Sequence, residues 1–180
     1  MKNSSRPVNH FVILEPVSEI FHVALDLLKK QKGQESLEII YCSTPEQAAN
    51  EIREASPCVV GFSIEKMESA ATAINFMRSI ADKVDAKEIK VIAVNKVSTP
   101  ALTKLLDKVK LSVVVTEPVP TRTLMFKLLL QIKAVELVRK QLELKAKQEE
   151  RISFNGSRKS EKDEDQDAIR FSLGGRQGKD

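Results

Sequence analysis

The sequence predicts an α/β sandwich in which a five-stranded parallel sheet is covered by helices on both faces. The run CVVGFS at residues 58–63 contains no charge and lies between Pro57 and the charged pair Glu65 and Lys66. A run of this kind is typical of a strand buried on both faces. Four other short apolar runs occur along the chain, and a segment of helical period follows each of the five. Such alternation predicts a parallel sheet, with ligand or signalling chemistry at the carboxyl ends of its strands.

The first two strand–helix units follow a loose leader at residues 1–9. The first strand covers His10 to Glu15, and the helix after it covers residues 17–32, before Gly33. Its apolar spacing predicts an inner face made of Ile20, Val23, Ala24, Leu27 and Leu28. The second strand covers residues 37–42 and leads into Thr44-Pro45-Glu46-Gln47, a capping residue followed by proline at the first helical position. We expect this second helix to end near Ala55.

The remaining three units follow the central strand. Residues 68–84 carry an apolar stripe at three- and four-residue spacing, which predicts a long buried helix. The fourth strand covers residues 89–95, and Thr99-Pro100 caps the fourth helix. The fifth strand covers residues 111–116, and the fifth helix begins near Pro120.

The last helix is longer than the sheet needs. From residue 121 to about Arg151 the chain contains neither Gly nor Pro, and its first half is expected to pack through Leu124, Leu128 and Ile132. We assign residues 10–132 to the sandwich and 133–151 to a helical extension. A 3-4 alternation there fits either a short coiled coil or a frayed amphipathic end, and its members are Ile132, Val135, Arg139, Leu142 and Ala146. Residues 152–180 are polar and indicate a disordered tail or a linker.

Composition excludes several classes of function. Residues 1–119 hold 15 basic and 15 acidic side chains, so the net charge of +4 arises from the later residues. This bias and an aromatic content of 4% argue against nucleic-acid binding. No apolar run approaches the roughly 18 residues of a membrane span, and the polar start is not a signal peptide, so we expect a cytoplasmic protein. Cys42 and Cys58 fit a reducing compartment and core packing, and no zinc pattern is present.

Three segments resemble the receiver domain of bacterial two-component response regulators. FVILEPVSEI resembles the first strand with its acidic pair, PCVVGFSIEKM the central strand that carries the phosphoacceptor aspartate, and VTEPV the Thr-Lys-Pro of the fifth strand. The resemblance covers about residues 10–132. It implies a flavodoxin-like fold with strand order 2-1-3-4-5 and a site at the carboxyl ends of the strands.

Carried over residue by residue, this resemblance implies a degenerate site. The two Mg²⁺-binding acids fall on Glu15 and Pro16, and the phosphoacceptor falls on Ser63. The hydroxyl residue that ends the fourth strand of a receiver falls on Asn95, and the lysine that pairs with the phosphoryl group falls on Glu117. The aromatic switch residue of the fifth strand falls on Val114. Pro118 matches, which implies a cis Glu117–Pro118 bond. Phosphoryl transfer to a carboxylate needs a nucleophile, a metal ion and a cation, so we expect no phosphorylation, no enzymatic activity, no cofactor and no metal.

Polar and charged groups remain in the crevice that we expect at the carboxyl ends of the strands. We expect Ser63 and Asn95 to bond to each other. Glu15, Glu65 and Glu117, compensated by Lys66 and Lys96, form a candidate charge network; a weak cation site is the alternative.

The resemblance implies a pseudo-receiver that acts as a signalling or protein-interaction module. Its partner is another protein or a second copy bound through the extended helix. The candidate interaction surface comprises Lys104, Lys108, Lys110, Arg122, Lys127, Val135 and Leu142, although solvated charge is the simpler interpretation of the basic residues. The alternative function is a small-ligand or nucleotide-binding regulatory domain using the crevice, although the turn after the first strand lacks phosphate-binding glycines.

Overall fold

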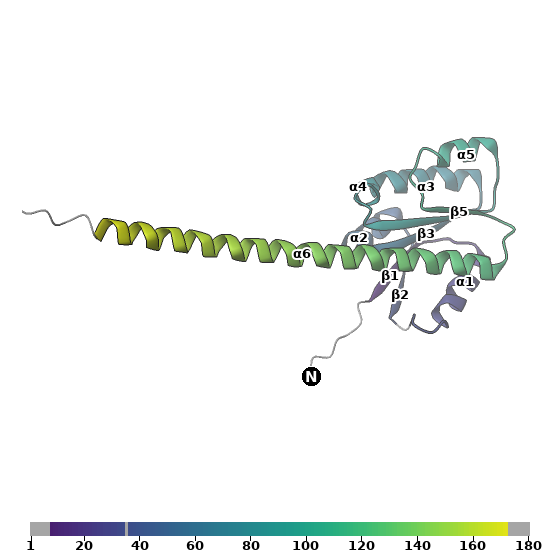
Figure 1. Cartoon of the computed structure of the whole chain (residues 1–180). Coiled ribbons are helices and arrows are strands. Elements are labelled where there is room, and N and C mark those ends of the chain that lie inside the picture. Colours follow the sequence, from purple (N-terminus) through teal and green to yellow (C-terminus); the bar gives the residue numbers. More distant parts are fainter. Residues whose placement is uncertain (1–7, 35, 173–180) are drawn as a thin grey trace, which may run out of the picture. The chain divides into compact units, whose positions relative to one another are not determined.

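The computed structural model describes residues 8–34 and 36–172, with side chains described through residue 152. Its five strands form one parallel sheet in the order β2-β1-β3-β4-β5, which confirms the predicted order (Figure 1). The strands are β1 (Asn9–Leu14), β2 (Leu37–Cys42), β3 (Cys58–Ile64), β4 (Ile89–Asn95) and β5 (Val113–Thr116). Every residue of β3 is buried, as the uncharged run predicts.

Two of the helices begin directly after the threonines predicted to cap them, whereas the first helix begins at Glu19 and ends at Lys29, within the predicted residues 17–32. The helices are α1 (Glu19–Lys29), α2 (Pro45–Ala55), α3 (Met67–Ser79), α4 (Ala81–Asp85), α5 (Pro100–Leu106) and α6 (Thr121–Ser172). The Thr44 side chain accepts a hydrogen bond from the Gln47 amide at 3.2 Å, and Thr99 accepts one from the Leu102 amide at 3.2 Å. A proline occupies the first turn of both α2 and α5, where its missing N–H leaves no helical bond unmade.

Two apolar layers cover the sheet, one on each face. One layer joins strand residues such as Val60 and Ala93 to α2, α3 and α5. The other joins residues such as Phe11 and Val94 to α1 and the first part of α6. Leu124, Leu128 and Ile132 are buried in this second layer, as predicted.

Two helical predictions need correction. The expected single helix over residues 68–84 is divided, because α3 ends at Ser79 and α4 begins at Ala81; the Ser79 hydroxyl donates to the Phe76 carbonyl at 2.7 Å. The inner face of α1 is also rotated from the predicted one. Phe21 and Leu25 are fully buried, while Val23 is 44% exposed.

The rotation of α1 is explained by Gly61 in the central strand. A Cβ at Gly61 would lie 2.6 Å from Cζ of Phe21 and 2.9 Å from Cε1 of Phe11. The two phenylalanine rings are themselves in contact, with centroids 6.3 Å apart in an edge-to-face arrangement. The missing side chain therefore creates the space that Phe21 fills, and this seats α1 on β3.

The chain divides into two compact units, residues 1–139 and residues 140–180. The first unit extends beyond the predicted boundary at residue 132. Val135 is only 2% exposed, and Arg139 forms hydrogen bonds with residues at the start of β1 and just before β3. Arg139 donates to Oδ1 of Asn9 at 2.8 Å and to the Pro57 carbonyl at 3.2 Å. Val135 thus belongs to the core and not to the predicted interaction surface or coiled-coil seam.

The described part of the second unit is the later part of α6. Residues 140–152 are all exposed, and helical backbone continues to Ser172, past the predicted end near Arg151. Of the predicted leader and tail, residues 1–7 and 173–180 lie outside the described residues. Among the described helices, none combines the length and the hydropathy that a membrane span requires.

Candidate functional site

The residues predicted to form the site gather at the carboxyl edge of the sheet. Main-chain hydrogen bonds continue the strand pairing into the loops that follow. The Glu15 amide donates to Cys42 at 2.9 Å, the Lys96 amide to Ile64 at 2.9 Å and the Glu117 amide to Asn95 at 2.8 Å. These bonds fix the starts of the loops after β1, β4 and β5. The Glu117–Pro118 peptide is cis, as the resemblance implies, and the Glu15–Pro16 peptide is also cis.

Ser63 lies at this edge and is 8% exposed. Its Oγ accepts a hydrogen bond of 2.9 Å from the amide of Ser18, the residue that precedes α1. The hydroxyl at the expected phosphoacceptor position therefore has a structural partner, because it satisfies a buried N–H at the start of a helix.

The predicted bond between Ser63 and Asn95 is wrong, and strand register explains why. Ser63 pairs with Val94, and Ile64 pairs with Asn95. Val94 belongs to the α1/α6 layer, whereas Ile64 belongs to the layer under α2, α3 and α5. Because side chains alternate along a strand, Ser63 and Asn95 lie on opposite faces of the sheet. Asn95 is 5% exposed and its Oδ1 has no hydrogen-bond partner in the described part of the chain.

The five members of the candidate charge network divide between two cavities. Glu15, Glu65 and Lys66 line a cavity of about 370 Å³ together with Pro16 and Ser63. Glu117 and Lys96 line a second cavity of about 310 Å³ beside the start of α1. Among the described residues, no ion pair joins these carboxylates to Lys66 or Lys96. Likewise, no group of three or more His, Cys, Asp and Glu side chains there could hold a metal ion.

The two cysteines lie on β2 and β3, which flank β1, and both are free and buried. Burial raises the pKa of the Cys58 thiol to about 12, with smaller opposing effects from Ser56, Arg139 and Lys83. Burial also raises the pKa of Cys42, and the nearby carboxylates of Glu51 and Glu15 add to the increase. Both groups are therefore protonated and unreactive at neutral pH.

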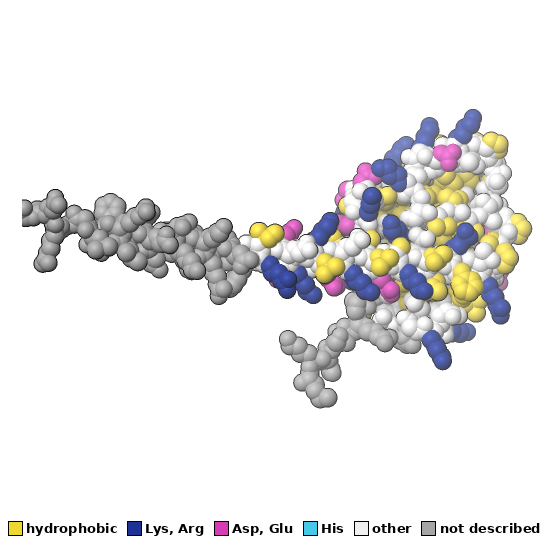
Figure 2. Space-filling model, in the orientation of Figure 1, with side chains coloured by type: hydrophobic (Ala, Val, Ile, Leu, Met, Phe, Trp, Pro, Cys, Tyr) yellow, Lys and Arg dark blue, Asp and Glu magenta, His cyan; other side chains and the backbone are white. Residues whose placement is uncertain are grey.

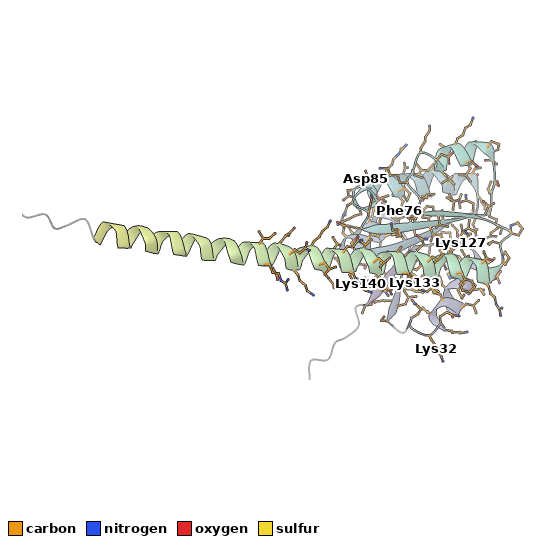
Figure 3. The ribbon with its side chains drawn as sticks, viewed as in Figure 1. Lys32, Phe76, Asp85, Lys127, Lys133 and Lys140 are labelled. Carbon is orange, nitrogen blue, oxygen red and sulfur yellow. The ribbon has the colours of Figure 1, made fainter. Side chains whose placement is uncertain are left out.

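Most residues of the predicted interaction surface are exposed in the structure. Lys104, Lys108 and Arg122 are exposed, and Lys110 pairs with Asp85 at 2.6 Å. Leu142, in the second unit, is 43% exposed. Figure 3 places Lys127, Lys133 and Lys140 along α6, where Lys127 is half-buried and the other two are exposed.

Sequence reasoning missed the largest exposed apolar side chains of the first unit. Phe126, Leu130 and Leu137 on α6 are 58%, 61% and 61% exposed. Figure 2 shows hydrophobic and basic side chains interspersed along this helix. Spacings of four and seven residues were visible in the sequence and could have indicated a second apolar face beside the buried one.

The comparisons with known proteins give structural likeness alone. No family model and no curated protein matches the chain. A LuxR-family DNA-binding response regulator from Staphylococcus aureus is similar at 20% identity and a TM-score of 0.53, over 69% of this chain and 99% of that one. A CheY-like receiver domain protein from Methanospirillum hungatei JF-1 is similar at 15% identity and a TM-score of 0.51, over 72% and 98%.

A third similar structure contains a coiled coil. It is a fusion with the trimeric coiled coil of yeast Spc42, at 15% identity and a TM-score of 0.52, over 81% of this chain and 93% of that one. At these identities the likeness establishes the fold and nothing finer. The chain therefore has the flavodoxin-like fold of CheY-like receiver domains, with a long C-terminal helix.

Proposed function

We propose that this chain is a pseudo-receiver, which acts without phosphorylation as a signalling and protein-interaction module in a bacterial two-component-type system. One observation carries the proposal. The residue at the phosphoacceptor position, Ser63, is a buried hydroxyl that already accepts the Ser18 amide. Receivers are phosphorylated on an ionised carboxylate at this position, and this chain has a hydrogen-bonded hydroxyl there instead.

The surroundings of Ser63 support the same conclusion. Pro16 stands where a second metal-binding acid is expected, and Glu117 stands where a lysine is expected to pair with the phosphoryl group. The position that supplies the ammonium group in receivers thus carries a carboxylate, which would repel a phosphoryl dianion instead of pairing with it. No step of phosphoryl transfer is then stabilised, and the module is not an enzyme.

The proposed contact surface is the outer face of α6. Phe126, Leu130 and Leu137 expose apolar side chains there, and Leu144 continues the seven-residue spacing of Leu130 and Leu137 along the sequence. This spacing suits a coiled coil with a protein partner or with a second copy. Lys133, Lys140 and Lys147 repeat at the same interval. Such regularly placed ammonium groups favour a partner helix that carries acidic side chains over a parallel pair of identical helices.

Beryllofluoride, a phosphoryl analogue, tests the first part of the proposal. We expect Mg²⁺ and beryllofluoride to leave the melting temperature and the amide NMR spectrum of the chain unchanged. The variant Ser63→Asp alone should also stay unresponsive, while the triple variant Pro16→Asp, Ser63→Asp, Glu117→Lys should bind the analogue. Saturable binding by the unaltered chain would contradict the proposal.

Light scattering on the full chain tests the second part. The double variant Leu130→Glu, Leu137→Glu changes only exposed positions, so it should remain folded. If the chain self-associates through this face, the variant should be monomeric at concentrations where the unaltered chain is not. A self-associated state that the variant leaves intact would exclude the outer face of α6 as the contact.

A further inference from the structure

A cavity of about 310 Å³ lies on the α1/α6 side of the carboxyl edge, apart from the larger cavity that contains Ser63. The first turns of α1, the loop after β4 and the segment that leads from β5 into α6 build it. Its lining includes Ser18, Glu19, Ile20, Val23, Lys96 and Glu117. All of these residues belong to the first compact unit.

Two oxygen atoms in this lining are buried and have no hydrogen-bond partner among the residues that the structure describes. Ser18 is 4% exposed, and its Oγ is unpartnered although its amide donates to Ser63. Ser18 immediately precedes α1, yet its side chain makes no capping bond to the helix. Oε1 of Glu117 is the second unpartnered atom. Buried polar atoms are nearly always hydrogen-bonded. The carboxylate oxygen of Glu117 can only accept, and the hydroxyl of Ser18 can accept or donate, so a ligand with several N–H donors can satisfy both.

The charges around the cavity decide which kind of donor fits. Glu19 and Glu117 contribute two carboxylates, and Lys96 contributes one ammonium group. In the described part of the chain, Lys96 forms no ion pair with either acid. The side chains of the lining thus carry a net negative charge, which opposes the partial positive charge of the helix starts and disfavours phosphates and other anions. Its two carboxylates also fall short of a group of three His, Cys, Asp or Glu side chains, and no such group that could hold a metal ion occurs among the described residues.

We propose that this cavity binds a primary alkylammonium group. The ammonium would donate to Oγ of Ser18 and Oε1 of Glu117, since it carries one positive charge and three N–H donors. The aliphatic stem would lie along Ile20 and Val23, which form the apolar part of the lining. A free alkylamine and a lysine side chain share this chemistry. The inference does not depend on the pseudo-receiver proposal, because it uses no phosphoryl or partner contact.

The test is a titration of the full ¹⁵N-labelled chain with n-butylammonium, followed by amide NMR. Saturable shifts are expected at Ser18, Lys96 and Glu117. Tetramethylammonium, which has the charge without N–H donors, and n-butanol, which lacks the charge, should bind at least about tenfold more weakly. Nα-acetyl-lysine methylamide distinguishes the two sources. If it binds as tightly as n-butylammonium, the site accepts a lysine side chain, and if it does not, the ligand is a free amine.

Three variants sharpen the test. Glu117→Gln should lower the affinity for n-butylammonium about tenfold by removing a charge-assisted acceptor. Lys96→Ala should raise it about threefold, because Lys96 is a competing cation. Glu65→Gln, in the other cavity, is the matched control and should change nothing.

Two kinds of result would overturn the proposal. The first is the absence of saturable shifts with n-butylammonium. The second is weaker binding of n-butylammonium in Lys96→Ala, since removal of a competing cation should strengthen it. Lys96 is exposed, so this variant gives a result even if Glu117→Gln fails to fold.

Discussion

Arg139 is the last residue of the first compact unit, and its hydrogen bonds join α6 to the residues before β3 and at the start of β1. Replacing it with alanine tests where the domain ends. The guanidinium donates to Asn9 at 2.8 Å and to the Pro57 carbonyl at 3.2 Å, and Nδ2 of Asn9 donates to Glu136 at 2.7 Å. Asn9 is 6% exposed, so its Oδ1 would lose a partner at a buried site. A hydrogen bond to a charged group contributes about 1.5–3 kcal/mol, and the partial exposure of Arg139 favours the lower end.

We therefore expect Arg139→Ala to lower the free energy of unfolding by about 2 kcal/mol, which corresponds to a melting temperature about 4–8 °C lower. Urea denaturation followed by circular dichroism measures the first quantity and thermal scanning the second. Lys140→Ala, at the next position and exposed, is the matched control and should change neither.

A double-mutant cycle isolates the contact itself. Arg139→Ala combined with Asn9→Ala should cost less than the sum of the two single changes, with a coupling of about 1 kcal/mol. If Arg139→Ala costs no more than Lys140→Ala, the domain ends near residue 132, as the sequence indicates, and the docking of α6 through Arg139 is refuted.

Three further predictions concern the core and a helix cap. Gly61→Ala should lower the free energy of unfolding by about 1–3 kcal/mol in urea denaturation, because its Cβ would lie 2.6 Å from Phe21; an unchanged midpoint would show that α1 shifts freely. Burial raises the pKa of Cys58 to about 12 from 9.0 in the unfolded chain, so the folded state binds the proton more tightly and stability is lost as pH rises above about 9. Between pH 8 and 10, the free energy of unfolding should fall by about 1.4 kcal/mol more than in Cys58→Ala, and parallel curves would contradict this. Thr44→Ala should cost about 1 kcal/mol by removing the cap on the Gln47 amide, whereas Thr44→Ser should melt like the unaltered chain.

The strands and caps could be predicted because their signals are local. Pro45 and Pro100 follow capping threonines, and the structure starts α2 and α5 at these prolines. The uncharged run at residues 58–63 likewise indicates the central strand, because a short run without charge is typical of a strand covered on both faces. Strand order came from the resemblance to receiver domains, and it is confirmed.

The partner of Ser63 could not be predicted in the same way. Its bond to the Ser18 amide depends on how deeply α1 sits, which depends in turn on Phe21 filling the space above Gly61. A helix with apolar residues at 20, 21, 23, 24, 25, 27 and 28 offers more than one stripe, and spacing alone does not select between them. The choice is made by a glycine 40 residues later, which no pattern within α1 can reveal.

In the first unit, one face of α6 is buried in the domain core and the opposite face is exposed. This difference decides which variants can test assembly without disturbing the fold. Leu128, Ile132 and Val135 are buried in the domain core, so a partner that used this face would have to unfold part of the domain. The exposed side chains of Leu130 and Leu137 belong to the opposite side of the helix and are available while the core remains intact. A change in oligomeric state with Leu130→Glu, Leu137→Glu can therefore be attributed to a lost contact between molecules, provided that the denaturation midpoint is unchanged. Truncation after residue 133 would remove Val135 and Arg139, and could not separate assembly from folding.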